Sequence, residues 1–270
     1  MGVILAPLRL LGLVALLIVG LAIGAAGFPW LRQTARNRII RRWSALLMAV
    51  CGVRVQVVHA GATLPPSLAA TGMQPGGPGR LLLINHISWI DIFGINAAMP
   101  ARFVAKAEIG AWPVMGTLVT LAGTLYIERG RRHAVHAMNV KVRDRLAAGE
   151  SVAVFAEGTT TDGLTLLPFH SNLVAPAVEA GCEVWPVALR YTQRGAPSTA
   201  AAFIGEMTLP ESMWRILTAR GLVMEVAFLP PVATGAAEGG TAPTRHQIAH
   251  EARAAIGRYL DLPVDAPTPH

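Results

Sequence analysis

A histidine and an aspartate stand close enough in this chain to act as a base and its orienting carboxylate. They are His86 and Asp91, which follow the apolar segment Leu81 to Ile84 in the run Asn85-His86-Ile87-Ser88-Trp89-Ile90-Asp91. Residues five positions apart on one regular helix point about 140° away from each other, so the two side chains cannot pair on a continuous helix. They can pair if His86 lies on a turn after a strand and Asp91 lies in the first turn of a helix, which we expect from Ile90 to Met99.

In that arrangement the helix dipole favours the acidic side chain of Asp91. Its carboxylate would accept a hydrogen bond from one imidazole nitrogen of His86 and leave the other nitrogen free to take a proton from a hydroxyl. This chemistry needs no serine, cysteine or metal. One short motif of two common residue types can also arise by chance.

Three further segments resemble strands that deliver polar groups at their ends. Gly123 to Arg129 predicts a short strand that ends in an arginine, Val154 to Thr159 predicts one that ends in Glu157-Gly158-Thr159, and Val184 to Leu189 predicts a third. The carboxyl ends of strands are where α/β folds build their sites. A guanidinium there suits bidentate capture of a phosphate or carboxylate, although Arg129 could also belong to a solvated basic face. Glu157 could instead cap a turn by accepting from the amides of the two residues that follow it.

These four segments, in this order, resemble the glycerolipid acyltransferase family, which includes the 1-acylglycerol-3-phosphate acyltransferases. The resemblance covers Leu81 to Leu189 and extends to Lys106-Ala107-Glu108, Pro113 and Gly116. It implies an α/β fold with a mixed central sheet flanked by helices, and it implies that His86 is the general base and Asp91 holds it. The residues that it places at the polar head of the acceptor are Asn85, Gly123, Arg129, Glu157, Gly158 and Thr159.

The chain departs from the family pattern in the third segment. The usual Phe-Pro-Glu-Gly-Thr-Arg has Ala156 in place of the proline and Thr160 in place of the arginine, which removes one expected cation. The continuation Thr161-Asp162-Gly163 and then Leu167 to Ser171 is similar to the branch that acylates lyso-ornithine lipid, whose head is a zwitterionic amino acid. The resemblance to the family as a whole implies 1-acyl-sn-glycerol-3-phosphate as the acceptor, and these departures make lyso-ornithine lipid the alternative.

The composition indicates association with a membrane. Hydrophobic residues make up 53% of the 270 residues and charged residues only 14%. Leu10 to Trp30 carries no charged residue and would extend about 31 Å as a helix, which is long enough to cross a bilayer core. A basic cluster follows it, whereas Arg9 alone precedes it; the cluster comprises Arg32, Arg36, Arg38, Arg41 and Arg42.

The positive-inside rule then predicts that the rest of the chain faces the cytoplasm, at the cytoplasmic membrane. A cleaved signal peptide is a rival, since Gly24, Ala25 and Ala26 follow the apolar stretch, but the arginines lie on the wrong side of it for that. A third arrangement is a hairpin with the helix Ile39 to Val50 that lies in the interface, with Trp30 and Trp43 near the headgroups.

The net charge of +7 could suggest nucleic acid, but much of the excess lies in the juxtamembrane cluster and the aromatic residues are not interleaved with basic ones. Cys51 and Cys182 lack the spacing of metal ligands, so we expect reduced thiols, no metal and no cofactor.

The chain divides into three predicted parts. Residues 1–50 would form the membrane anchor and basic helix, 51–262 the acyltransferase domain, and 263–270 a disordered tail. Within the domain we expect a Pro/Gly-rich loop from Gly61 to Gly79, a helix from Arg132 to Ala148, a strand from Leu222 to Phe228, and a last helix to Tyr259 that opens with a capping box at Thr244 and Gln247.

The sequence thus predicts direct transfer of a fatty acyl group from acyl-CoA or acyl carrier protein to a lysolipid hydroxyl. Two other classes of protein fit the same residues: a lipid-binding membrane protein without catalytic activity, and a thioesterase or lipid hydrolase that places water where the acceptor hydroxyl would lie.

Overall fold

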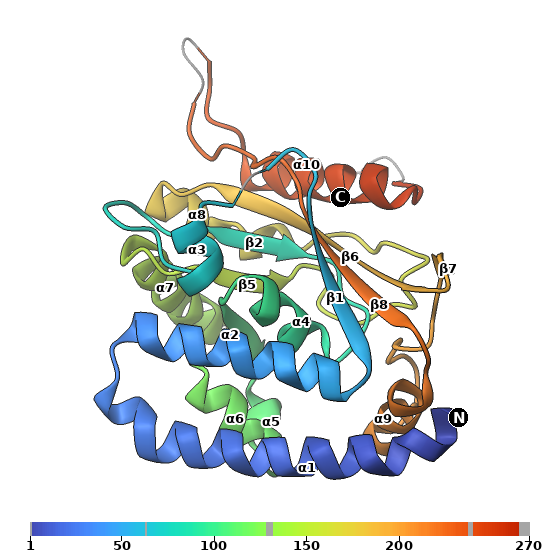
Figure 1. Cartoon of the computed structure of the whole chain (residues 1–270). Coiled ribbons are helices and arrows are strands. Elements are labelled where there is room, and N and C mark those ends of the chain that lie inside the picture. Colours follow the sequence, from blue (N-terminus) through green and yellow to red (C-terminus); the bar gives the residue numbers. More distant parts are fainter. Residues whose placement is uncertain (1, 63, 128–131, 237–239, 265–270) are drawn as a thin grey trace.

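The computed structural model describes residues 2–62, 64–127, 132–236 and 240–264 of the chain. Its centre is a mixed, eight-stranded sheet with the strand order β1-β8-β6-β2-β5-β3-β4, and β7 pairs with β6 (Figure 1). Neighbouring strands on this path are parallel except β6 and β8, which are antiparallel. The strands are β1 Val53–His59, β2 Leu81–Ile84, β3 Arg102–Lys106, β4 Leu125–Ile127, β5 Val152–Phe155, β6 Val184–Gln193, β7 Ala196–Pro197 and β8 Leu222–Phe228.

The central strand β2 shows why the sheet is covered on both faces. All four of its residues are fully buried, as expected for a continuous apolar run in the parallel part of a sheet. Because side chains alternate along a strand, Leu82 and Ile84 enter one core cluster while Leu81 and Leu83 enter another. The predicted mixed sheet flanked by helices is therefore confirmed.

Helices cover the two faces of the sheet. The first core cluster packs the sheet against α2 (Gln33–Val50) and α4 (Asp91–Ala98). The second packs it against α7 (Arg132–Ala147), α8 (Ala175–Ala180) and α10 (Arg245–Leu260). Figure 1 shows α10 on one side of the sheet and α2 and α4 on the other. Shorter helices complete the fold: α3 Pro66–Thr71, α5 Ala107–Gly110, α6 Met115–Leu121, α9 Leu209–Thr218 and the 3-10 turn η2 Ser171–Leu173.

The N-terminal apolar segment forms the long helix α1 (Gly2–Gly27), and the short turn η1 (Phe28–Trp30) connects it to α2 as a helical hairpin. The two helices touch closely, since the indole of Trp43 donates to the carbonyl of Leu16 at 3.0 Å and a Cβ on Gly20 would lie 2.8 Å from the same ring. By length and composition alone, the stretch from Leu5 to Trp30 could cross a membrane.

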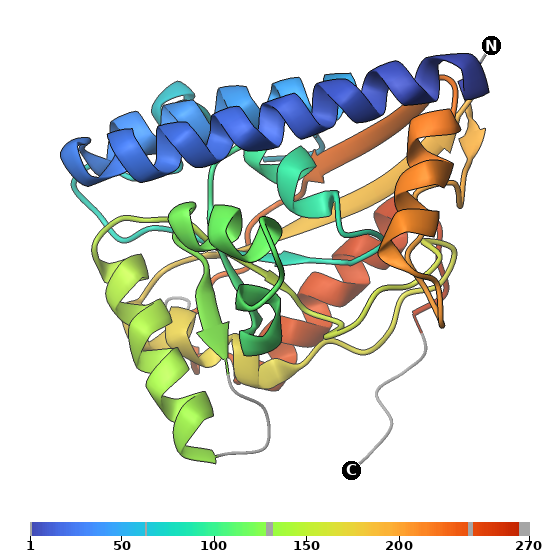
Figure 2. The same cartoon turned by 90° about the horizontal axis from the view of Figure 1, so that it is seen from below.

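The helix α1 lies along the domain instead of projecting from it. It packs against α2, α6 and α9, and Figures 1 and 2 show it running beside the domain for its whole length. The guanidinium of Arg9 donates to the carbonyls of Leu217 and Ala219, at 2.7 and 3.0 Å, at the end of α9. The outer face of α1 is apolar, with Leu8 and Leu11 both 67% exposed.

Most predicted elements occur close to their expected bounds. The strands at Leu81–Ile84 and Leu222–Phe228 and the capping box at Thr244 and Gln247 are confirmed, and both cysteines are free. The predicted loop from Gly61 to Gly79 was wrong in part, because α3 lies inside it. The strands β1 and β3 and the helix α9 were not predicted. Most of the predicted disordered tail lies outside the described residues.

Candidate active site

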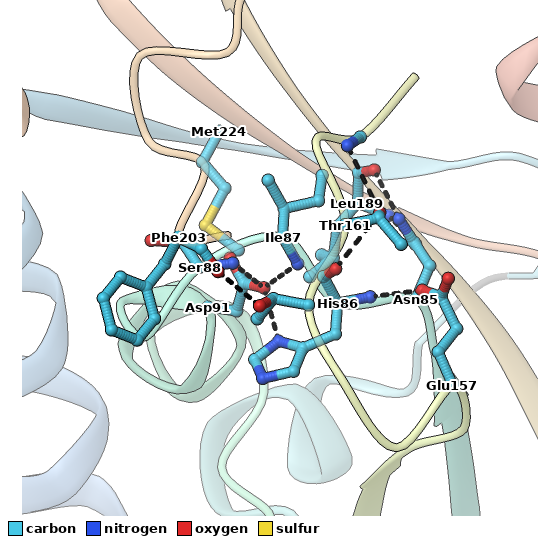
Figure 3. Close-up of polar contacts among 12 residues, drawn as sticks. Asn85, His86, Ile87, Ser88, Asp91, Glu157, Thr161, Leu189, Phe203 and Met224 are labelled. Atoms are coloured by element: carbon cyan, nitrogen blue, oxygen red, sulfur yellow. Dashed lines mark hydrogen bonds and ion pairs between the residues drawn. The ribbon is translucent and has the colours of Figure 1, made fainter. Parts of the chain in front are cut away.

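His86 and Asp91 meet at the carboxyl end of β2, at the turn into α4. His86 is the second residue after the strand, and Asp91 is the first residue of the helix. The imidazole Nδ1 lies 2.9 Å from Asp91 Oδ2, as Figure 3 shows. The Asp91 side chain is completely buried, whereas the imidazole is 18% exposed. The predicted pairing is thus confirmed, and Nε2 is the ring nitrogen that does not contact Asp91.

The Asp91 carboxylate accepts more hydrogen bonds than the one from His86. Its Oδ2 also accepts from the backbone amides of Ile87 and Ser88, at 2.8 and 2.9 Å (Figure 3). Its Oδ1 accepts from the hydroxyl of Tyr191 at 2.7 Å. The local turn and the distant strand β6 therefore hold the same carboxylate.

The backbone around His86 is held from several sides. Glu157 Oε1 accepts from the amide of His86 at 2.8 Å, and the amide of Thr161 donates to the carbonyl of His86 at 2.8 Å (Figure 3). The amide of Phe203 donates to the carbonyl of Ile87 at 2.9 Å. Loops from two separate parts of the chain thus fix the backbone of the turn that carries the histidine.

Glu157 lies beside His86 but points into the protein. Its side chain is buried, and its second oxygen accepts from the amide of Leu167 at 2.8 Å. Burial raises the pKa of this carboxyl to about 7, and the hydrogen bonds from the amides of Leu167 and His86 and the charge of Arg253 oppose that rise. The partners of the carboxylate are therefore the backbone amides of His86 and Leu167.

Asn85 also has a structural partner. Its amide nitrogen donates to the carbonyl of Leu189 at 3.0 Å, and its side-chain oxygen accepts from the amide of Leu189 at 2.7 Å. The residue is 1% exposed, so it joins β2 to β6 directly before His86.

The other residues expected at the acceptor head are not all next to His86. Gly158 and Thr159 follow β5, next to His86, because β2 and β5 run parallel with Ile84 opposite Phe155. Gly158 has a positive φ of 70°, and a Cβ there would lie 2.9 Å from Nε2 of His170. Arg129 lies outside the described residues.

Gly123 is not brought together with His86. The strand β4 pairs with β3, β3 with β5, and β5 with β2, and this register puts Gly123 at the same level of the sheet as Leu81. That level is about 16 Å along the strands from His86. Gly123 has φ of 87°, its carbonyl accepts from the guanidinium of Arg102 at 3.2 Å, and a Cβ would lie 1.9 Å from that group. Its contacts therefore shape the start of β4.

An aromatic stack leads away from the histidine. The ring of Phe155 lies 3.7 Å from the imidazole of His86, centroid to centroid, with 9° between the planes. Phe103 stacks on Phe155 at 5.6 Å. Phe103 also lines an apolar cavity between α1, α2, α4 and α6, whose walls include Ile23, Ile40, Ile92 and Leu118.

The two departures in the third segment have structural consequences. The amide of Ala156 donates to the carbonyl of Ile84 at 2.9 Å, a bond that a proline could not make. The hydroxyl of Thr160 donates to the carbonyl of Phe203, so this side chain connects two loops.

The sequence analysis did not predict that Phe155, Tyr191 and His170 lie near His86 and the loop after β5. Phe155 and Tyr191 lie in or next to predicted strands, but their partners come from distant parts of the chain. Among the described residues, no group of three His, Cys, Asp or Glu side chains could hold a metal ion.

Comparisons with known proteins show the family of this chain. Residues 65–190 match the model of the family described as Acyltransferase. The chain is 36% identical to a lyso-ornithine lipid O-acyltransferase of Pseudomonas aeruginosa over 83% of this chain and 82% of that one. It is also 36% identical to a 1-acyl-sn-glycerol-3-phosphate acyltransferase of Neisseria gonorrhoeae, over 72% of this chain and 78% of that one.

The fold is similar to that of the crystal structure of the 1-acyl-sn-glycerophosphate acyltransferase PlsC from Thermotoga maritima. The TM-score is 0.58, and the match covers 94% of this chain and 96% of that one at 17% identity. At that level of identity the match shows the fold alone.

Proposed function

Because this chain belongs to the acyltransferase family, we propose that it transfers a fatty acyl group from a thioester to the free hydroxyl of a lysolipid. The observation that carries the proposal is the hydrogen bond of 2.9 Å between His86 Nδ1 and the buried carboxylate of Asp91. That bond fixes the ring, which is 18% exposed, and leaves Nε2 as the nitrogen that does not contact Asp91. A base held in this way matches the chemistry of a hydroxyl nucleophile.

The proposed reaction has two steps and no covalent acyl-enzyme. Nε2 of His86 takes the hydroxyl proton while the oxygen attacks the thioester carbonyl, which forms the new C–O bond and a tetrahedral intermediate. The C–S bond then breaks, and the imidazolium returns the proton to the thiolate that leaves. Asp91 stabilises the imidazolium that forms between these steps.

The apolar cavity behind Phe103 is the proposed place for an acyl chain. It begins beyond the stack of His86, Phe155 and Phe103 and extends between α1 and α2. Apolar walls stabilise a hydrocarbon chain by removing it from water. The acyl donor, which is acyl-CoA or acyl carrier protein in this proposal, would keep its polar part outside.

The first candidate for the acceptor is 1-acyl-sn-glycerol-3-phosphate, the substrate in the name of the Neisseria relative. Its phosphate would be bound at the turn formed by Glu157, Gly158 and Thr159 and by Arg129. The buried carboxylate of Glu157 supports the shape of that turn, and the exposed Thr159 offers a hydroxyl to the head group.

Lyso-ornithine lipid is the second candidate, and the side chain at position 160 favours it. The family usually has an arginine there, whereas the hydroxyl of Thr160 is engaged by the carbonyl of Phe203. A pocket with one cation fewer suits a zwitterionic head better than a phosphate monoester. The Pseudomonas relative, which covers more of this chain, is named for that substrate.

The N-terminal hairpin supports a location on the cytoplasmic membrane, with residues 51–262 as the catalytic domain on the cytoplasmic side. The exposed leucines of α1 would enter the lipid, and the exposed arginines of α2 would meet anionic headgroups. Because α1 packs along α6 and α9, we place it in the interface plane.

The test uses membranes that carry the protein, with labelled acyl-CoA and acyl carrier protein as donors and both lysolipids offered in parallel. His86→Ala should abolish transfer, whereas His136→Ala, a control on the exposed face of α7, should retain it. Asp91→Asn should cause a large but incomplete loss, because the base remains.

Each product identifies one function. Phosphatidic acid establishes the first acceptor, and ornithine lipid establishes the second. Free fatty acid without either product would indicate a thioesterase, and equal transfer by the wild type and His86→Ala would overturn the proposed mechanism. Binding of lysolipid without turnover would indicate a lipid-binding protein.

A further inference from the structure

Tyr191 is a buried residue of β6 whose hydroxyl reaches the catalytic pair from a distant part of the chain. It is 2% exposed and donates to Asp91 Oδ1 at 2.7 Å. His86 and the amides of Ile87 and Ser88 bind the other oxygen, Oδ2. Each oxygen of the carboxylate therefore has its own set of donors.

This division determines which way the carboxylate faces. The donors on Oδ2 come from one turn, which moves with Asp91 itself, whereas Tyr191 belongs to a strand in the centre of the sheet. Its hydrogen bond stops rotation of the carboxylate about its own axis relative to the sheet. We propose that Tyr191 is a positioning residue for acyl transfer, which acts on His86 through Asp91.

The surroundings of Tyr191 keep its hydroxyl a donor. Burial, and then the charge of Asp91, raise the pKa of the phenol well above its ordinary value. The hydroxyl of Tyr191 therefore stays protonated at neutral pH. The hydroxyl also lies 3.4 Å from the sulfur of Met224. A Cβ on Gly94 would lie 2.0 Å from that sulfur, so the glycine in α4 leaves the space that the side chain of Met224 needs next to Tyr191.

The inference rests on the proposed function, and the first experiment separates the two. We would measure kcat and KM for Tyr191→Phe, with His86→Ala as the inactive reference. The control is Tyr259→Phe, which removes the same atom from a tyrosine that donates to Glu225 at 3.0 Å. We expect kcat of Tyr191→Phe to fall about 10- to 100-fold with little change in KM, and Tyr259→Phe to resemble the wild type.

The pH profile gives a readout that a merely structural role would not move. The charged and titratable groups close to the pair are Glu157 and Tyr191, with Cys51 near Tyr191. Without the Tyr191 hydroxyl, more of the negative charge of Asp91 is available to the imidazolium. The acidic limb of kcat/KM should therefore move to higher pH in Tyr191→Phe.

A second variant removes no atom from the core and so avoids a failure to fold. Tyr191→3-fluorotyrosine has a more acidic phenol, which is a stronger donor, and should move the acidic limb to lower pH. Shifts in opposite directions support the inference. A Tyr191→Phe enzyme with the wild-type kcat and pH profile, or a fluorinated enzyme that shifts in the same direction as Tyr191→Phe, would overturn it, while loss of activity in His86→Ala would still support the proposed function.

Discussion

At the scale of single residues, the site depends on groups that hold the backbone of His86. Glu157 is the clearest of these, because its two oxygens accept from the amides of His86 and Leu167, both at 2.8 Å. The carboxylate thus connects the turn that carries His86 to the loop after β5. It was expected to face the acceptor head, and its geometry gives it a second role in placing the base.

Replacement of this carboxylate by an amide should therefore affect both activity and stability. Glu157→Gln offers one acceptor oxygen for two backbone donors and turns its NH₂ group towards the other. At pH 5 the folded protein keeps this carboxyl protonated, yet both of its oxygens can still accept, whereas the amide nitrogen of glutamine cannot. We expect lower kcat and, at that pH, a loss of about 1–3 kcal/mol in the free energy of unfolding, measured by urea denaturation in detergent. Glu206→Gln, at an exposed carboxylate, is the matched control.

The pH dependence of that loss follows from the pKa of Glu157, which burial raises to about 7 from 4.5. A raised carboxyl pKa means that the folded state favours the protonated form. The stabilisation is therefore fully present below about pH 4.5 and is lost as the pH rises through 7. The stability difference between the wild type and Glu157→Gln should shrink from pH 5 to pH 8, by about 3 kcal/mol at most. A difference that grows with pH would contradict this account.

At the scale of strands and helices, the parallel register decides which predicted residues can share a site. Gly123 comes two residues before β4, whereas Arg129 lies outside the described residues. Gly123 then contacts Arg102, which also pairs with Glu150. The glycine is required by the positive φ and by the approach of the guanidinium.

A substitution pair separates those two requirements. Gly123→Ala adds a methyl group where the guanidinium of Arg102 already lies, 1.9 Å away, whereas Gly76→Ala meets nothing within 4 Å at a similar φ of 74°. We expect Gly76→Ala to cost about 1 kcal/mol from backbone strain and Gly123→Ala to cost more, about 2–4 kcal/mol. Unfolding midpoints in urea measure both, and equal losses would show that Arg102 moves away freely.

Contacts of the site between residues that are close in the chain could be predicted from the sequence, whereas contacts between residues far apart in the chain could not. His86 and Asp91 are near neighbours in the chain, so their spacing was enough, and the capping box at Thr244 was equally local. Tyr191 reaches Asp91 across 100 positions, and Phe155 meets His86 only through the pairing of β5 with β2. Contacts of this kind depend on strand order, which the periodicity of one segment does not give.

At the scale of the whole molecule, the orientation of α1 relates the catalytic domain to the bilayer. This helix would be about 39 Å long, enough to span, yet one side of it packs on α2, α6 and α9. Arg9 ties its N-terminal half to the end of α9. If α1 crossed the membrane in this conformation, α6 and α9 would enter the hydrocarbon region with it, which their polar groups disfavour.

A helix α1 that lies in the interface and a helix α1 that spans the bilayer place the N-terminus on different sides of the membrane. If α1 lies in the interface, a cysteine introduced by Gly2→Cys lies on the same side as one introduced by Ala196→Cys at the exposed start of β7. An impermeant maleimide should then label both in inverted vesicles and neither in sealed spheroplasts. The native thiols add little background, since burial raises the pKa of Cys51 to about 12 and that of Cys182 to about 11. Labelling of Gly2→Cys from the outside alone would mean that α1 spans the bilayer and leaves its contacts with α6 and α9, and the hairpin would then be an anchor separate from the domain.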